Sequence, residues 1–208
     1  AVAKARQCMS RRARLRVGLS AGLAMLALPG CNHTEGQVEL HWAFLDRDSA
    51  PVVPGNSLTL PDTCSLLGTL DPDIGETRYA LEVVLHTCLS SCTDGCLTDP
   101  ACQVIAPQRF SCETTRATVD LPASEDPYLF ATEVVARQED SETCACAISS
   151  TCVATPGSRL RKVLAGLVTD LQVQQMVLTT LDFAGDFDSD RNLHLDLATC
   201  CEPSETCN

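Results

Sequence analysis

Apolar and polar residues alternate along several short stretches of the chain, and the first of these stretches is 37–45. A period of two is typical of a β-strand with one buried face, so this stretch is predicted to be a strand. The stretch 78–86 alternates in the same way. The residues expected to face the core are Val38, Leu40, Trp42 and Phe44 in the first stretch, and Tyr79, Leu81, Val83 and Leu85 in the second.

Further strand-like runs are expected after a cysteine-rich loop at 88–102. They lie at 103–111, 115–121, 128–136, 159–164 and 171–181. Proline- and aspartate-containing turns separate the runs, and no convincing helix is found between them. About seven short strands with turns between them are typical of a sandwich. We therefore expect an all-β fold, a disulfide-stapled antiparallel β-sandwich over 37–181. In the last run the buried face is expected to hold Leu171, Val173, Val177 and Leu181.

A basic stretch followed by an apolar stretch precedes the first strand. The apolar stretch Val17–Leu28 has 12 residues, whereas a membrane-spanning helix needs about 20. This length suits the core of a signal peptide. The stretch ends in Leu28-Pro29-Gly30-Cys31, which resembles the lipobox of bacterial lipoproteins, with Leu three positions before the cysteine and a small residue directly before it. Pro29 departs from the usual residue in the middle of that motif.

The lipobox resemblance implies cleavage before Cys31 and a diacylglycerol on its sulfur, so that lipid holds the protein on a membrane. The expected organisation is a signal peptide at 1–30, a lipidated tether at 31–36, the sandwich at 37–181 and an acidic, cysteine-containing segment at 182–208. Met9 is the expected true start. Because Asn32 rather than Asp follows the cysteine, we expect the outer membrane of a Gram-negative bacterium.

Charge is distributed unevenly along the chain. Residues 1–30 contain six basic residues and no acidic residue, which leaves nine basic against 27 acidic residues in the remainder, a net charge of −18. Nucleic-acid binding needs clustered Lys and Arg, so this charge argues against a nucleic-acid partner. The expected partners are the membrane, through the lipid anchor, and an envelope protein or glycan.

Twelve of the fourteen cysteines remain after Cys8 and the lipidated Cys31 are set aside. Export to an oxidising compartment predicts that all twelve form disulfides. The connectivity stays open, although Cys200 and Cys201 are expected to bond elsewhere rather than to each other. The alternative is a zinc site at Cys88, Cys92, Cys96 and Cys102, whose spacing lacks paired Cys-x2-Cys motifs. The expected disulfide cysteines are Cys64, Cys88, Cys92, Cys96, Cys102, Cys112, Cys144, Cys146, Cys152, Cys200, Cys201 and Cys207.

An acidic stretch near the C-terminus has oxygen-bearing side chains at alternate positions. Such spacing suits Ca²⁺, which takes about six to eight oxygen ligands. The stretch resembles the calcium loop of integrin-type propeller repeats, although Ser189 and Arg191 stand where that loop has glycines. The alternative is a solvated acidic turn before a final strand. The candidate calcium ligands are Asp186, Asp188, Asp190, Asn192 and Asp196.

Three segments together resemble the transthyretin-like sandwich of carboxypeptidase-regulatory-like domains and of Gram-negative envelope lipoproteins. The segments are Val38–Trp42, Leu121-Pro122 with Tyr128–Phe130, and Gly166–Val173. The resemblance implies a non-enzymatic binding or spacer module.

No hydrolase motif such as Gly-x-Ser-x-Gly or His-Glu-x-x-His occurs, and His41 and His86 are predicted on outward strand faces. We therefore expect a lipid-anchored, non-enzymatic binding or structural module with no resident cofactor other than calcium. A calcium-dependent adhesion module and a periplasmic enzyme are the alternatives.

Overall fold

The computed structural model describes residues 34–53, 64–68, 77–141, 144–179, 193–194 and 196–201. The described residues all belong to one compact unit of the chain. The predicted signal peptide, Cys31 and Cys207 lie outside the described residues. Within the described part of the chain, no helix is long and apolar enough to cross a membrane.

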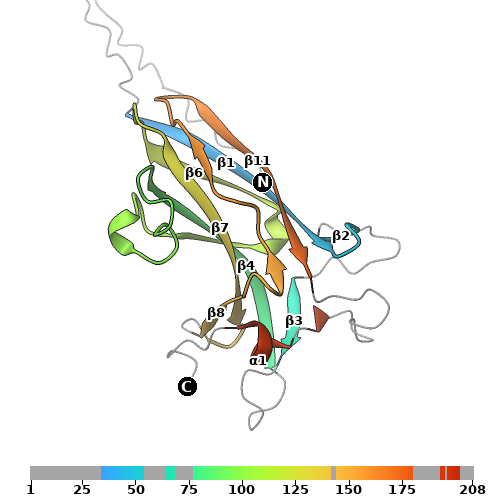
Figure 1. Ribbon diagram of the computed structural model, residues 1–208. Helices are drawn as coiled ribbons and strands as arrows, with labels where there is room; N and C mark the ends of the chain where they lie inside the picture. The colour runs from blue at the N-terminus through green and yellow to red at the C-terminus, as the bar shows by residue number, and fades with distance from the viewer. Residues whose placement is uncertain are drawn as a thin grey trace, which may run out of the picture. The chain divides into compact units, whose positions relative to one another are not determined.

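The described residues form two β-sheets (Figure 1), as the alternating pattern predicts. In the first sheet the strand order is β2-β1-β11-β9, and β6 pairs with the first half of β1. Its strands are β1 (Glu35–Asp46), β2 (Pro51–Val53), β6 (Arg116–Pro122), β9 (Val153–Ala154) and β11 (Val168–Leu178).

The second sheet is built on a long antiparallel pair, β4 (Thr77–Leu89) with β7 (Tyr128–Gln138). Its order is β10-β7-β4-β3-β12, with β5 paired to β4 and β8 paired to β7. The shorter strands are β3 (Ser65–Gly68), β5 (Gln108–Ser111), β8 (Ala145–Ala147), β10 (Arg159–Arg161) and β12 (Leu193–His194). The described helices are η1 (Pro100–Cys102), η2 (Cys112–Thr114) and α1 (Leu197–Cys200).

The core between the sheets contains the residues that the alternation in β1 and β4 predicts. All eight side chains expected to face inward from these strands are buried, with exposed fractions of 3 % or less. Trp42 is the largest of them, and its indole Nε1–H donates to the carbonyl oxygen of Cys112 at 2.9 Å. Its ring also stacks on Phe110, with 5.9 Å between ring centroids. The sandwich prediction is confirmed.

Most strand pairs are antiparallel, as predicted, but two pairs are parallel and make both sheets mixed. Strand β11 runs parallel to β1, and β12 runs parallel to β3. After β10, at the edge of the second sheet, the chain crosses to the end of the first sheet where β1 begins. Gly166 N–H donates to the Glu35 carbonyl oxygen there, so β11 must start beside the start of β1 and run in the same direction.

The predicted buried face of β11 is correct at Leu171 and wrong at Val173, while Val177 is half-buried and the predicted Leu181 lies outside the described residues. Gln172 has a positive φ of 64°, and the register with β1 shifts between Glu39 and His41. This bulge moves the following side chains to the opposite face, because side-chain direction alternates with every residue. Val173 is therefore 53 % exposed, while Gln174, Met176 and Leu178 are buried.

Two other predicted strands are shorter in the structure than in the prediction. The run predicted at 103–111 is a strand only at Gln108–Ser111, directly after Pro107, which has no N–H to donate to a sheet. The predicted final strand is limited, in the described residues, to the two residues of β12, which α1 follows.

Ten of the described cysteines form disulfides with one another, in five pairs. The pairs are Cys64–Cys112, Cys88–Cys96, Cys92–Cys102, Cys146–Cys201 and Cys152–Cys200. Cys144 is disulfide-bonded as well. The adjacent Cys200 and Cys201 bond to different partners, as expected, and the run 88–102 closes on itself. The zinc alternative is wrong, since its four cysteines are paired and leave no thiolate to bind a metal.

Candidate functional site

The cysteine loop, defined here as Leu89–Cys102, covers the outer face of β4 and β7, the face that points away from the main core. Figure 1 shows this part of the chain projecting beside β7. The Cys88–Cys96 and Cys92–Cys102 disulfides cross-link it. Beneath it lies a second small core, made by Cys88, Cys96, Cys102, Leu129 and Ala131. Two disulfides in so short a segment give the loop a fixed shape without a large core.

His86 lies under this loop and is only 4 % exposed. It points outward from the main core, as predicted, but the loop shields it from solvent. Its Nε2 lies 3.0 Å from Glu133 Oε1, and its Nδ1 lies 3.2 Å from Gln103 Nε2. Gln103 Nε2 also donates to the Cys96 carbonyl oxygen. Both ring nitrogens thus lie within hydrogen-bond distance of a side chain, and through Gln103 His86 helps hold the loop on the sheet.

A cleft of about 280 Å³ lies between the cysteine loop, β7 and the segment 155–158. This is close to the lower end of the range for small-molecule sites, about 300–1,000 Å³. The two disulfides of the cysteine loop fix one wall, and β7 supplies Ala131 and Thr132. The residues that line the cleft are Thr93, Asp94, Cys96, Leu97, Thr98, Ala131, Thr132, Thr155, Pro156 and Ser158.

Hydroxyl groups dominate this lining. Five of the ten lining residues are Thr or Ser, one is Asp, and none of the ten is basic. The Thr132 hydroxyl is itself buried, so the hydroxyl-bearing residues left to face a ligand are Thr93, Thr98, Thr155 and Ser158. A hydroxyl both donates and accepts a hydrogen bond. The cleft therefore suits a neutral ligand that carries hydroxyl or amide groups, and it is poorly suited to a phosphate or another strong anion.

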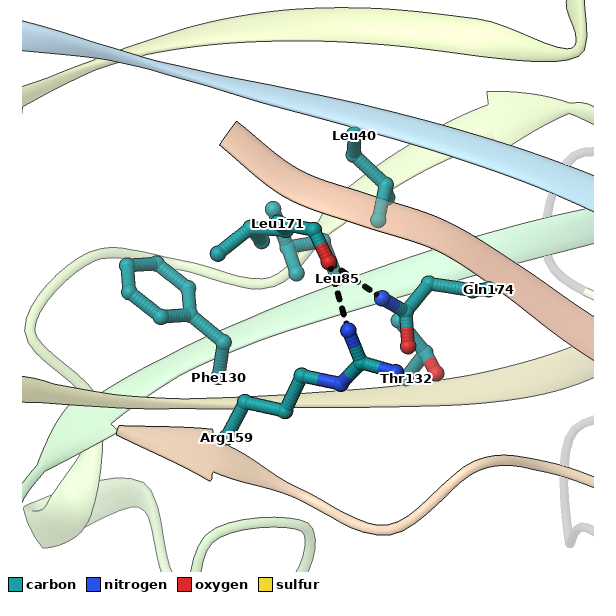
Figure 2. A pocket seen from close by; sticks show the side chains of 7 residues that line it. All are labelled: Leu40, Leu85, Phe130, Thr132, Arg159, Leu171 and Gln174. Carbon is teal, nitrogen blue, oxygen red and sulfur yellow. Dashed lines mark hydrogen bonds between the residues drawn. The ribbon is translucent and has the colours of Figure 1, made fainter. Parts of the chain in front are cut away.

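A second, much smaller cavity lies between the two sheets, lined by Leu40, Leu85, Phe130, Thr132, Arg159, Leu171 and Gln174. Figure 2 shows the side chains of Arg159 and Gln174 both pointing to the Leu171 carbonyl oxygen. Arg159 Nη1 donates to that oxygen at 3.0 Å, and Gln174 Nε2 donates to it at 2.7 Å. The volume of about 10 Å³ is that of a site for one water molecule at most. This cavity is therefore structural: its polar side chains hold the bulge of β11.

The candidate calcium ligands are described in the structure only at Asp196. This residue caps the N-terminus of α1, where its Oδ2 accepts from the Thr199 hydroxyl at 2.7 Å. The hydrogen bonds from Thr199 lower the pKa of the Asp196 carboxyl. Asp186, Asp188, Asp190 and Asn192 lie outside the described residues, so the calcium site stays a prediction. Among the described residues, no group of three or more His, Cys, Asp or Glu side chains is placed to hold a metal ion.

The fold defines the class of protein as a disulfide-rich all-β sandwich with a polar cleft beside a cysteine loop. Comparisons with protein-family models, with curated proteins and with solved structures found no match.

The sequence patterns do not reveal the cleft, because its walls come from three separate segments. The residues 93–98, 131–132 and 155–158 meet only through the pairing of β4 with β7 and the disulfides of the loop. The one signal in the sequence is the concentration of Thr and Ser near the cysteine cluster.

Proposed function

We propose that the protein is a non-enzymatic binding module of the bacterial cell envelope, held on a membrane by lipid at Cys31. The lipobox-like Leu28–Cys31 supports the anchor. The hydroxyl-lined cleft at the cysteine loop is the observation that supports a binding role rather than a purely structural one.

The proposed ligand is a neutral envelope glycan. A glycan presents hydroxyl and acetamido groups, which match side chains that both donate and accept hydrogen bonds. The absence of basic groups from the described lining disfavours phosphorylated or acidic glycans. One wall of the cleft is held before binding by two disulfides, which lowers the entropic cost of ordering the site around a ligand.

The direct test is binding of the purified protein to an array of neutral and acetamido oligosaccharides that includes muramidase-solubilised peptidoglycan fragments. The double variant Thr98→Val/Thr155→Val removes two lining hydroxyls. It is expected to weaken binding about tenfold or more, since each lost hydrogen bond is worth about 1 kcal/mol.

Thr118→Val is the matched control, because Thr118 is exposed on β6 in the other sheet. It should bind as the wild type does. Binding to none of the glycans, or binding that the cleft variants leave unchanged, would refute the glycan proposal.

A further inference from the structure

A turn with exposed apolar side chains lies at the end of the sandwich where β1 begins. The leucine turn, defined here as Leu164–Val168, is closed by a hydrogen bond from Leu167 N–H to the Leu164 carbonyl oxygen at 3.1 Å. Gly166 has φ 70°, a conformation that favours glycine at this place in a turn. Leu164, Leu167 and Val168 are 45 %, 55 % and 59 % exposed, so the turn presents three apolar side chains to its surroundings.

The leucine turn is fixed to the first residues of β1. Gly166 N–H donates to the Glu35 carbonyl oxygen and Gln37 N–H donates to the Leu167 carbonyl oxygen, each at 2.9 Å. A Cβ at residue 36 would overlap the carbonyl oxygen of Leu164 and the side chain of Val163, so glycine is required for this close contact. In Figure 1 the starts of β1 and β11 lie side by side at one end of the sandwich.

The proposed anchor brings this same end to a bilayer. Cys31 is four positions before Glu35 in the sequence. A chain extends by at most about 3.6 Å per residue, so the lipidated cysteine lies no more than about 14 Å from the start of β1. The headgroup region of each leaflet is roughly 5–8 Å deep. With the lipid inserted, the leucine turn is therefore within reach of the membrane interface.

We infer that the leucine turn is a membrane contact: Leu164, Leu167 and Val168 enter the interface of the bilayer that holds the Cys31 lipid. This inference rests on the anchor in the proposed function. A second copy of the chain is the alternative occupant. A stable dimer needs about 1,200–2,000 Å² of buried surface, far more than three side chains supply, so the bilayer is the proposed occupant. A bilayer contact, in contrast, only adds to the hydrophobic burial of the lipid chains.

The charged residues at this end of the sandwich do not favour a strongly anionic membrane over a zwitterionic one. Arg161 and Lys162 precede the turn, but the exposed carboxylates of Glu35, Glu125 and Asp126 lie on neighbouring segments. The contact is therefore expected with zwitterionic phosphatidylethanolamine vesicles and with vesicles that also contain phosphatidylglycerol.

The test places a tryptophan on the turn of the full lipidated protein and reconstitutes it in vesicles with brominated acyl chains. Bromine quenches only a nearby indole, and the native Trp42 is buried, with 2 % exposed. In Leu167→Trp, the brominated chains should quench at least half of the fluorescence that the new tryptophan adds. Val173→Trp, at a residue 53 % exposed further along β11, should lose little.

The outcomes separate the turn from the anchor. Wild-type protein that does not float with vesicles refutes the anchor and, with it, the contact. Flotation with no quenching at Leu167→Trp, or with equal quenching at both sites, refutes the contact while the anchor stands. A Cys31→Ser protein that sediments as a dimer, and as a monomer after Leu164→Asp/Leu167→Asp, would assign the turn to a second copy instead.

Discussion

At the scale of single residues, Thr132 combines burial with an unpaired polar group. It is 7 % exposed, and its Oγ1 has no hydrogen-bond partner among the described residues. A buried hydroxyl without a partner costs about 1–3 kcal/mol. Thr132→Val keeps the shape of the side chain and removes this hydroxyl, so the free energy of unfolding should rise by about 1 kcal/mol in urea titrations.

Thr169→Val is the control for this change. The Thr169 hydroxyl donates to the Lys162 carbonyl oxygen at 3.0 Å, so its loss should lower the free energy of unfolding by about 1 kcal/mol. If Thr132→Val destabilises the protein as Thr169→Val does, the Thr132 hydroxyl forms a stabilising hydrogen bond and is not unpaired.

The acidic residues 186–196 carry a separate prediction. If they bind Ca²⁺ in the folded protein, a hundredfold excess over Kd stabilises it by about 2.7 kcal/mol. Millimolar Ca²⁺ should then raise Tm by several degrees, Mg²⁺ should raise it less, and Asp188→Ala should abolish the difference. Asp126→Ala, an exposed acid elsewhere, is the control. A Tm indifferent to Ca²⁺ in wild type and both variants would leave only a solvated acidic segment.

At the scale of elements, the contact between β1 and the leucine turn depends on Gly36. Gly36→Ala adds a methyl group that overlaps the Leu164 carbonyl oxygen, so backbone must move. Such overpacking costs about 1–3 kcal/mol. Gly157→Ala is a matched control, because a Cβ there meets nothing within 4 Å. Thermal unfolding should show a clear loss for Gly36→Ala and almost none for Gly157→Ala; equal effects would contradict the close contact.

The disulfides differ in the length of chain that they close. Cys152–Cys200 spans 48 residues and Cys88–Cys96 spans 8, while all four cysteines are similarly buried. In the chain-entropy model, replacing the first pair with Ser should cost about 1.5 kcal/mol more than replacing the second. Urea unfolding of the two double variants measures this difference. A larger loss for the short pair would mean that the cysteine loop stabilises the fold by packing rather than by chain constraint.

The strands that sequence predicts well are those with one buried face and few polar exceptions. β1 and the first half of β4 follow this pattern, and their predicted core residues are buried. In the second half of β4 both faces are buried, so that Val84, His86 and Thr87 are buried as well, which the alternation does not predict. The face of β11 could not be predicted, because its bulge depends on hydrogen bonds from Arg159 and Gln174 to a carbonyl oxygen. Likewise, His86 has an outward position in the pattern, and only the fold of the cysteine loop shows that it is buried.

At the scale of the whole molecule, disulfides and a second small core supplement a main core that contains few aromatic residues. The chain has five Phe, two Tyr and one Trp. Five disulfides among the described residues stabilise the fold. One joins the residue before β3 to η2, and two close the cysteine loop. The other two attach α1 to the residue before β9, and the residue after α1 to β8. The segment 196–201 is thereby held to the sandwich covalently. The site and the membrane contact proposed here both use segments that these constraints and the sheet hydrogen bonds keep in place.

The anchor at Cys31 is the central claim, because both the envelope role and the membrane contact depend on it. The most direct measurement is detergent-phase partitioning of the wild-type protein and of Cys31→Ser, produced in a bacterium that lipidates exported proteins. The thiol of Cys31 is the lipid acceptor, so the wild type should enter the detergent phase and Cys31→Ser should stay in the aqueous phase. A Cys31→Ser protein that still enters the detergent phase would contradict the account.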